Sequence, residues 1–391
     1  MKSLLLSPIR LRQIEFRNRV MISPMCQYSA VDGMANDWHL VHLGQFALGG
    51  AGGVMFEATA VQAQGRITPG DLGLWQDSQV EPLARIVRFL NANGARAGIQ
   101  LGHSGRKGSS QAPWYGMGPL TEKDVEERGH APWQTVSSSP QEFSPEWPVP
   151  HALTQVEIAD LVGSWKQSAV RAELAGFDFL EIHAGHGYLL HQFLSPLCNL
   201  RSDSYGGGLM NRSRLLLEVT QAVRSVWPEH KPLFVRLSVI DGIEGVGWSL
   251  KDSVTLVHEL KSLGVDVIDC SSSGINGVSA ASTVTRQLGF QVPLASAIRK
   301  EADIATMAVG LILEPSHAEK IIEEEHADLI AIGREALANP RWAARAAFEL
   351  EMQPLMFEEW PKQYGWWLAR RERILTQLNL STAAPDLQLR N

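Results

Sequence analysis

The chain has 391 residues, of which 45% are hydrophobic and 20% charged, a balance typical of a globular protein with one large domain or two medium ones. A net charge of -7 gives no basic field for nucleic acid or an anionic membrane, so we expect an enzyme acting on small molecules. No apolar run reaches membrane-spanning length, and the first leucines are interrupted too early for a signal peptide, so we expect a cytoplasmic protein.

Eight short apolar runs rich in β-branched residues predict buried strands. In chain order they are residues 19–23, 53–57, 97–101, 177–182, 233–237, 265–269, 304–309 and 328–332. Helical stretches lie between them, for example at 154–175, 211–226 and 315–326, and Thr154 with Glu157 forms the sequence of a capping box. This alternation predicts one (β/α)8 TIM barrel, as a single domain over residues 1–391.

Three segments lie outside the alternation. Residues 2–18 are expected to form a hairpin that closes the bottom of the barrel. Residues 104–152, rich in Pro, Trp, Gly and Ser, form a long insertion after the third strand, which we expect to cap the catalytic face. Residues 352–391 form a C-terminal tail.

Catalytic residues of a barrel gather at the C-terminal ends of its strands. The predicted strands end at Ser23–Tyr28, Glu57–Ala60, Gln100–His103, His183–Tyr188, Arg236, Ser271–Gly274, Gly310 and Gly333–Arg334. Gly310 and Gly333, followed by Arg334, suit a phosphate held by backbone N–H groups and a guanidinium. A tight turn with a surface arginine is the alternative interpretation of this pattern.

His183, His186 and Tyr188 follow the fourth strand in the sequence HAGHGY. A zinc site would need a third ligand, and the helical HExxH arrangement is absent; two purely structural histidines are another alternative. We favour two imidazole donors for an anionic substrate oxygen, beside a phenol that delivers a proton to a nearby carbon. No metal is expected.

Arg236 lies between apolar residues of the fifth strand and therefore needs a negative partner. A phosphate, a substrate carboxylate or a reduced flavin ring would serve. A salt bridge inside the barrel, to Glu181 or Asp269, is the alternative.

Together these motifs resemble the old yellow enzyme family of FMN-dependent ene-reductases. The stretch SPMCQYS at residues 23–29 is similar to the branch that contains the bacterial xenobiotic reductases. Residues 183–196, then 199–207 and 211–214, are similar to the long central signature of the family. The resemblance extends from about residue 4 to residue 370.

The resemblance implies a role for each matching position. The residues expected around the flavin and its phosphate are Ser23, Pro24, Met25, Cys26, Ala60, Gln100, His183, Arg236, Gly310, Gly333 and Arg334. His183 and His186 would bind the carbonyl oxygen of an α,β-unsaturated substrate, and Tyr188 would protonate its α-carbon after hydride transfer to the β-carbon. Tyr28 would shape the substrate pocket. Cys26 would tune the flavin, with a simple packing role as the alternative.

The resemblance also implies bound FMN, with NADPH as the reductant and NADH as a possible substitute, and a homodimer or homotetramer. Three positions depart from the family pattern. Met210 and Gly208 replace the usual glutamate and serine, and Val309 stands where relatives carry a tryptophan. In the tail, Trp367, or else Trp366, is expected to close the pocket across a subunit interface, with packing as the alternative.

Two other functions compete with this one. A flavoprotein of the 2,4-dienoyl-CoA reductase type shares the barrel but adds an iron–sulfur cluster and further domains, for which three cysteines are too few. The lysine of dihydroorotate dehydrogenases is not found at the expected flavin site. A non-catalytic flavin-binding barrel is the remaining alternative.

Overall fold

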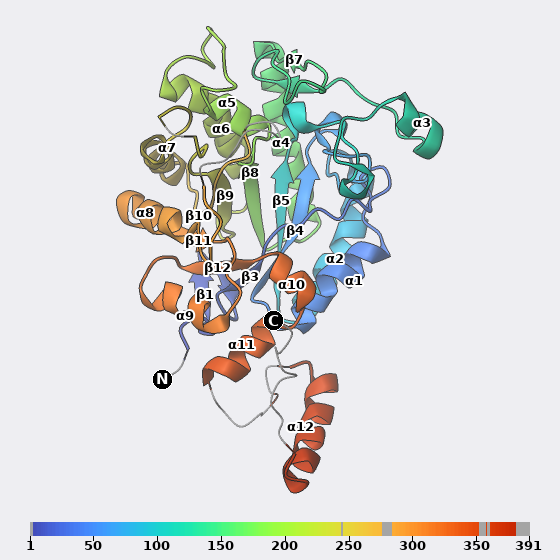
Figure 1. Cartoon of the computed structure of the whole chain (residues 1–391), viewed down its shortest axis with the longest axis vertical. Coiled ribbons are helices and arrows are strands. Elements are labelled where there is room, and N and C mark those ends of the chain that lie inside the picture. The colour runs from blue at the N-terminus through green and yellow to red at the C-terminus, as the bar shows by residue number, and fades with distance from the viewer. Residues whose placement is uncertain (1–2, 244, 276–283, 352–356, 358–359, 381–391) are drawn as a thin grey trace.

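The computed structural model describes residues 3–243, 245–275, 284–351, 357 and 360–380. Eight parallel strands close into a barrel in the order β10-β11-β12-β3-β4-β5-β8-β9 (Figure 1). They are β3 (Val20–Ile22), β4 (Gly53–Ala60), β5 (Arg96–Gly102), β8 (Phe179–Ala184), β9 (Leu233–Ser238), β10 (Val267–Ser271), β11 (Ala305–Ala308) and β12 (Leu329–Ile332). Each overlaps a predicted run, with β8 and β10 displaced by two residues, and the predicted TIM barrel is confirmed.

Helices surround the strands and cover their outer faces. They are α1 (Asp37–Leu48), α2 (Val80–Ala92), α4 (Gln155–Leu174), α6 (Leu209–Arg224), α7 (Leu250–Ser262), α8 (Val292–Ala302), α9 (Pro315–Glu323), α10 (Arg334–Ala338) and α11 (Trp342–Glu351). Helix α2 buries Leu83, Val87 and Leu90 at helical spacing, which turns one apolar stripe to the barrel. The predicted capping box is confirmed, because the Glu157 carboxylate accepts from Thr154 N at 2.7 Å.

The N-terminal end of the barrel is closed by apolar side chains. Strands β1 (Ile9–Leu11) and β2 (Ile14–Phe16) pair antiparallel as the predicted hairpin. Phe16 packs edge-on against Phe179 inside the barrel, with ring centroids 5.4 Å apart. Phe234 and Met307 belong to the same buried apolar cluster as Phe16 and Phe179.

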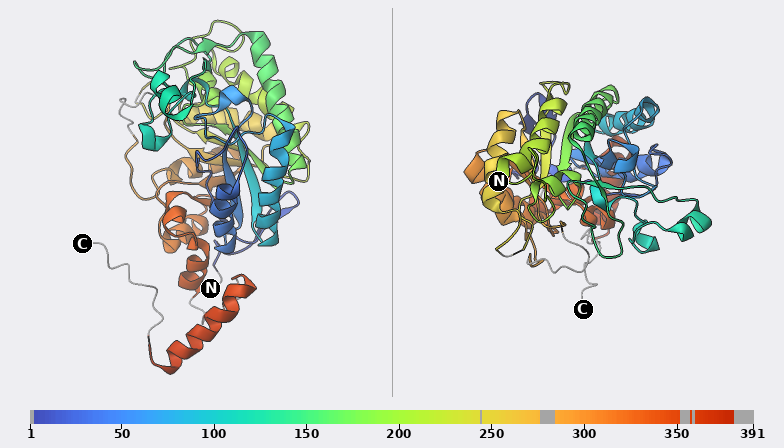
Figure 2. Two further views of the ribbon diagram at one scale, coloured as in Figure 1. Left: turned by 90° about the vertical axis from the view of Figure 1, so that its right-hand side faces the viewer. Right: turned by 90° about the horizontal axis from the view of Figure 1, so that it is seen from above.

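The insertion after β5 lies over the C-terminal ends of the strands (Figures 1 and 2). It contains α3 (Glu122–Arg128), β6 (Val136–Ser137) and β7 (His151–Ala152), and α5 (Leu189–Leu194) follows β8 nearby. Short 3-10 turns lie at Ala63–Gly65, Asp77–Gln79, Gly105–Lys107 and Pro113–Tyr115. Helix α12 (Lys362–Gln377) lies at the opposite end of the molecule.

Parts of the predicted tail, residues 352–356, 358–359 and 381–391, lie outside the described residues. Across the described ranges of the chain, none of the helices combines the length and apolarity needed to cross a bilayer.

Candidate active site

A pocket of about 340 Å³ opens at the C-terminal ends of the strands. It brings together most of the residues predicted to hold the flavin, from β3, β9, β11 and β12, with one of the paired histidines. The predicted residues that line it are Ser23, Pro24, Met25, His186, Arg236, Gly310, Gly333 and Arg334. Its volume falls within the range of small-molecule sites.

The donor set of this pocket fits a phosphate-bearing flavin. The hydroxyl of Ser23 is buried, with no hydrogen-bond partner in the described part of the chain, so it is available to a ligand. Arg236 and Arg334 bring guanidinium groups to the same pocket. Gly310 has φ +119°, a backbone conformation that favours glycine, so its backbone can approach the ligand closely.

Gln100 and Arg236 extend from a polar layer inside the barrel. The Arg236 Nε lies 3.1 Å from Asp269 Oδ2, so the intra-barrel salt bridge raised as an alternative is present. Gln100 Nε2 donates to Glu181 Oε1 at 2.7 Å. Burial, with nearby Asp269, raises the pKa of Glu181 to about 8.

His183, His186 and Tyr188 form one cluster at the end of β8. His183 Nε2 and His186 Nδ1 face each other at 3.3 Å. The ring of Tyr188 lies 5.1 Å from that of His183, centroid to centroid. Two imidazole nitrogens this close can share one substrate oxygen, with the phenol beside it.

The surroundings keep this cluster uncharged. Burial, followed by Arg236, lowers the pKa of both His183 and His186 well below the ordinary value, so both rings are neutral at pH 7. Burial, with Cys26 and Tyr28, raises the pKa of the Tyr188 phenol, which therefore keeps its proton. No group of three metal-ligating side chains occurs among the described residues.

Ser271, at the end of β10, contacts both His186 and Gln291. Its hydroxyl lies 2.6 Å from His186 Nε2. It also donates to Gln291 Oε1 at 3.3 Å. When the hydroxyl turns to donate to Nε2 instead, the hydrogen of the neutral His186 ring lies on Nδ1, the atom that faces His183. Ser271 lies at a predicted strand end, but it was given no role from the sequence.

The remaining predicted residues lie around the cluster. Ala60 lines a small cavity with His183 and Tyr188. The partly buried Cys26 has a thiol pKa raised by burial, and it forms a hydrogen bond with the Tyr28 hydroxyl. Tyr28 has φ +51° and does not line the flavin-sized pocket.

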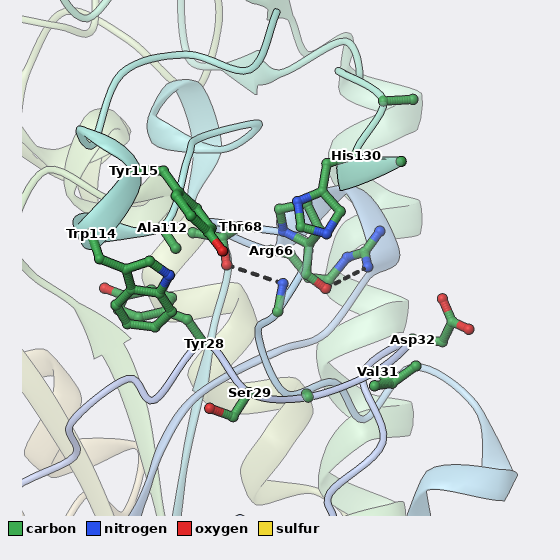
Figure 3. Close-up of a pocket in the computed structure, with 15 residues that line it drawn as sticks. Tyr28, Ser29, Val31, Asp32, Arg66, Thr68, Ala112, Trp114, Tyr115 and His130 are labelled. Carbon is green, nitrogen blue, oxygen red and sulfur yellow. Dashed lines mark hydrogen bonds between the residues drawn. The ribbon is translucent and has the colours of Figure 1, made fainter. Parts of the chain in front are cut away.

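Tyr28 opens instead onto an adjacent aromatic pocket of about 480 Å³ (Figure 3). There its ring meets Trp114 of the insertion edge-on, with centroids 5.9 Å apart. Tyr115 and His130 also line this pocket, beside Arg66. The insertion therefore contributes an outer wall on the catalytic face, where it was expected.

Lys107 was missed by the sequence analysis. Its Nζ donates to the carbonyl of His186 at 2.8 Å and lies 5.0 Å from the centroid of the Tyr188 ring. Burial, with Arg106, lowers the pKa of Lys107 to about 8. The available signal was a pair of basic residues directly after the predicted third strand, at the start of the insertion.

Trp367 lies far from this cluster within one subunit. It is 65% exposed on α12, at the opposite end of the barrel, and packs edge-on against Trp366 at 4.5 Å. Contact with a substrate therefore requires a second copy of the chain, so the pocket-closing role stays a prediction.

The sequence matches the NADH:flavin oxidoreductase / NADH oxidase family over residues 4–353. The chain belongs to this family. It is 41% identical over 352 residues to an NADPH dehydrogenase of Halalkalibacterium halodurans, covering 90% of this chain and 96% of that protein. It is 43% identical over 365 residues to an NADPH dehydrogenase of Listeria monocytogenes, covering 93% and 98%.

Solved structures agree with the family assignment. Morphinone reductase aligns with a TM-score of 0.73 at 25% identity, covering 89% of this chain and 90% of that one. An old yellow enzyme homologue from Zymomonas mobilis aligns with a TM-score of 0.71 at 25% identity, covering 90% and 93%. The resemblance to the old yellow enzyme family is confirmed, and the chain is an FMN-dependent NAD(P)H oxidoreductase.

Proposed function

We propose that this oxidoreductase reduces the activated C=C bond of α,β-unsaturated carbonyl compounds, with NADPH as the preferred reductant and NADH as a substitute. The observation that carries the proposal is the pair of imidazole nitrogens 3.3 Å apart, beside a protonated phenol and next to the flavin-sized pocket. The pocket residues predicted for FMN, with Gln100, Ala60 and Cys26 beside them, would hold the cofactor.

Each side chain has a distinct task. FMN, when bound, supplies a hydride to the β-carbon of the substrate. His183 Nε2–H and His186 Nδ1–H donate to the carbonyl oxygen, which draws electron density from the C=C bond and stabilises the enolate charge as it develops. Tyr188 then gives its hydroxyl proton to the α-carbon.

The outer residues define access. Tyr28 would contact the substrate beside Val309, and Trp367 of a second copy would close the pocket in a homodimer or homotetramer. The curated NADPH dehydrogenases are covered over 96% to 98% of their length, whereas 2-naphthoyl-CoA reductase is covered over 53%. The chain is 41% and 43% identical to those dehydrogenases and 24% identical to the reductase, and this difference favours a simple ene-reductase over an enzyme of the dienoyl-CoA reductase type.

An anaerobic visible spectrum tests the proposal. The protein loaded with FMN is titrated with NADPH, and with NADH in a parallel cell, and 2-cyclohexenone is then added. We expect the flavin band to bleach and to return with the enone. A band that bleaches but recovers with no activated alkene would refute ene-reduction, and absence of flavin binding would refute the site assignments.

A further inference from the structure

The turn that joins β8 to the proton donor has an unfavourable backbone conformation. His186 has φ +55° and Gly187 φ +74°, so two successive residues are left-handed, and the first is not glycine. A Cβ on Gly187 would lie 2.0 Å from the carbonyl oxygen of Gly274. Such a turn persists only where surrounding contacts hold it.

The peptide group between His186 and Gly187 is held at both ends. Its carbonyl accepts from Lys107 Nζ at 2.8 Å, and its N–H donates to His191 Nδ1 at 2.9 Å. The next carbonyl, that of Gly187, accepts from Gln192 Nε2 at 2.8 Å. These contacts determine the direction in which the chain enters Tyr188.

His191 is in turn held by Asp241, which follows β9. Both side chains are fully buried, and His191 Nε2 lies 2.8 Å from Asp241 Oδ1. Asp241 Oδ2 also accepts from Ser195 Oγ at 2.6 Å and from Trp248 N at 2.7 Å. Burial opposes ionisation of Asp241, but these hydrogen bonds, first that from His191, give it a lowered pKa.

The partners determine one tautomer of His191. The N–H of Gly187 can only donate, so Nδ1 must hold a lone pair, and the ring hydrogen lies on Nε2 and points to Asp241. His191 lies within residues 183–196, which resemble the family signature, but it was given no role from the sequence. Its side chain lies behind the turn and takes no part in the reaction proposed above.

We propose that His191, fixed by Asp241, is the positioning residue for the proton donor: its Nδ1 holds the Gly187 amide and thereby aims the Tyr188 hydroxyl at the substrate carbon. This inference rests on the proposed function. It concerns the protonation of the substrate carbon. The reduction of the flavin by NADPH does not depend on it. A displacement of about 1 Å in a reacting group can cost 100-fold in rate.

Two amide substitutions separate the two contacts of His191. In H191N the amide oxygen takes the place of Nδ1 and can still accept from Gly187 N–H, but the contact with Asp241 is lost. In H191Q the longer amide reaches Asp241, but no acceptor remains for Gly187. A merely structural role would make both variants behave alike.

The readout is the ratio of two oxidative half-reactions after reduction by NADPH, one with 2-cyclohexenone and one with menadione. Menadione is a quinone, and its reduction to the quinol places both protons on oxygen atoms. No carbon atom has to be protonated. We expect H191Q to lower the enone-to-menadione ratio by about 10- to 100-fold and H191N to preserve it. Equal losses in the two variants, or loss of both half-reactions together, would overturn the proposal.

Hydrogen–deuterium exchange of the peptide containing residues 187–194 gives a second readout that requires no turnover. We expect exchange to be faster in H191Q than in H191N, because only H191N keeps an acceptor for the Gly187 amide. If the wild type fails to reduce any enone, the proposed function falls, and this experiment still decides whether His191 holds the turn. Unchanged exchange in H191Q would refute that contact.

Discussion

Substitution of Tyr188 by phenylalanine is the most direct test of the proposed chemistry, because it removes the proton donor and little else. The ring contacts with His183, at 5.1 Å, and with the Lys107 ammonium, at 5.0 Å, do not depend on the hydroxyl. We therefore expect Y188F to fold, to bind FMN and to be reduced by NADPH at the wild-type rate.

The size of the effect follows from the role of the phenol. A positioned general acid contributes about 100- to 10,000-fold to a rate, which corresponds to about 3–5 kcal/mol of barrier. The raised pKa of Tyr188 ensures that the wild-type group is protonated before each turnover. We expect reoxidation by 2-cyclohexenone to slow by that factor in Y188F, while reoxidation by menadione is unchanged.

Stopped-flow measurement of the separate half-reactions provides the assay. The matched control is Y205F, because the Tyr205 hydroxyl donates to Glu218 at 2.9 Å and contacts no residue of the candidate site. Y205F should leave both half-reactions unchanged. An enone half-reaction as fast in Y188F as in the wild type would refute the assignment of the proton donor.

Other substitutions and pH test separate parts of the argument. S271A removes the hydroxyl 2.6 Å from His186 Nε2, so this ring nitrogen loses its hydrogen-bond partner, and we expect a raised KM for enones with unchanged reduction by NADPH. W367A should alter the steady-state kinetics of a cyclic enone, and identical kinetics would contradict a pocket-closing role. Burial lowers the pKa of His39 and His42 to about 4, whereas the ordinary pKa in an unfolded chain is 6.5. Between about pH 4 and about pH 6.5 the unfolded state therefore binds more protons than the folded state. The urea midpoint should therefore fall as pH decreases from about 6.5 to about 4, and a constant midpoint would show that these rings are not buried neutral.

The barrel could be predicted because its strands are buried on both faces. Such strands are continuous apolar runs, and all eight overlap the runs found in the sequence. The strand ends then identified the histidine pair, Tyr188 and most of the flavin-sized pocket. Contacts between residues that lie far apart in the sequence could not be predicted in this way. His191 is 50 residues from Asp241, and Lys107 is 79 residues from His186.

The same limit applies to residues whose environment decides their charge. The sequence shows that Arg236 requires a negative partner. It does not show whether that partner is a ligand, Glu181 or Asp269. In the structure the guanidinium pairs with Asp269, whereas Glu181 faces the amide of Gln100. Only the folded barrel shows that one carboxyl pairs with a cation and the other with a neutral group.

This division fixes the charge beneath the candidate site. Burial raises the pKa of Asp269 and, to about 8, that of Glu181, while Arg236 opposes the shift at both carboxyls. Glu181 is therefore mostly protonated at pH 7, and Asp269 is the carboxyl that pairs with the Arg236 guanidinium. The layer then holds one balanced ion pair instead of an excess negative charge. The neutral histidines thus lie above a balanced pair. The buried Asp71 lines the small cavity beside His183 and Tyr188, and the Lys107 ammonium adds a positive charge on the side of Tyr188. The arrangement thus favours negative charge that develops on a substrate oxygen, which is the electrostatic requirement of the proposed reduction.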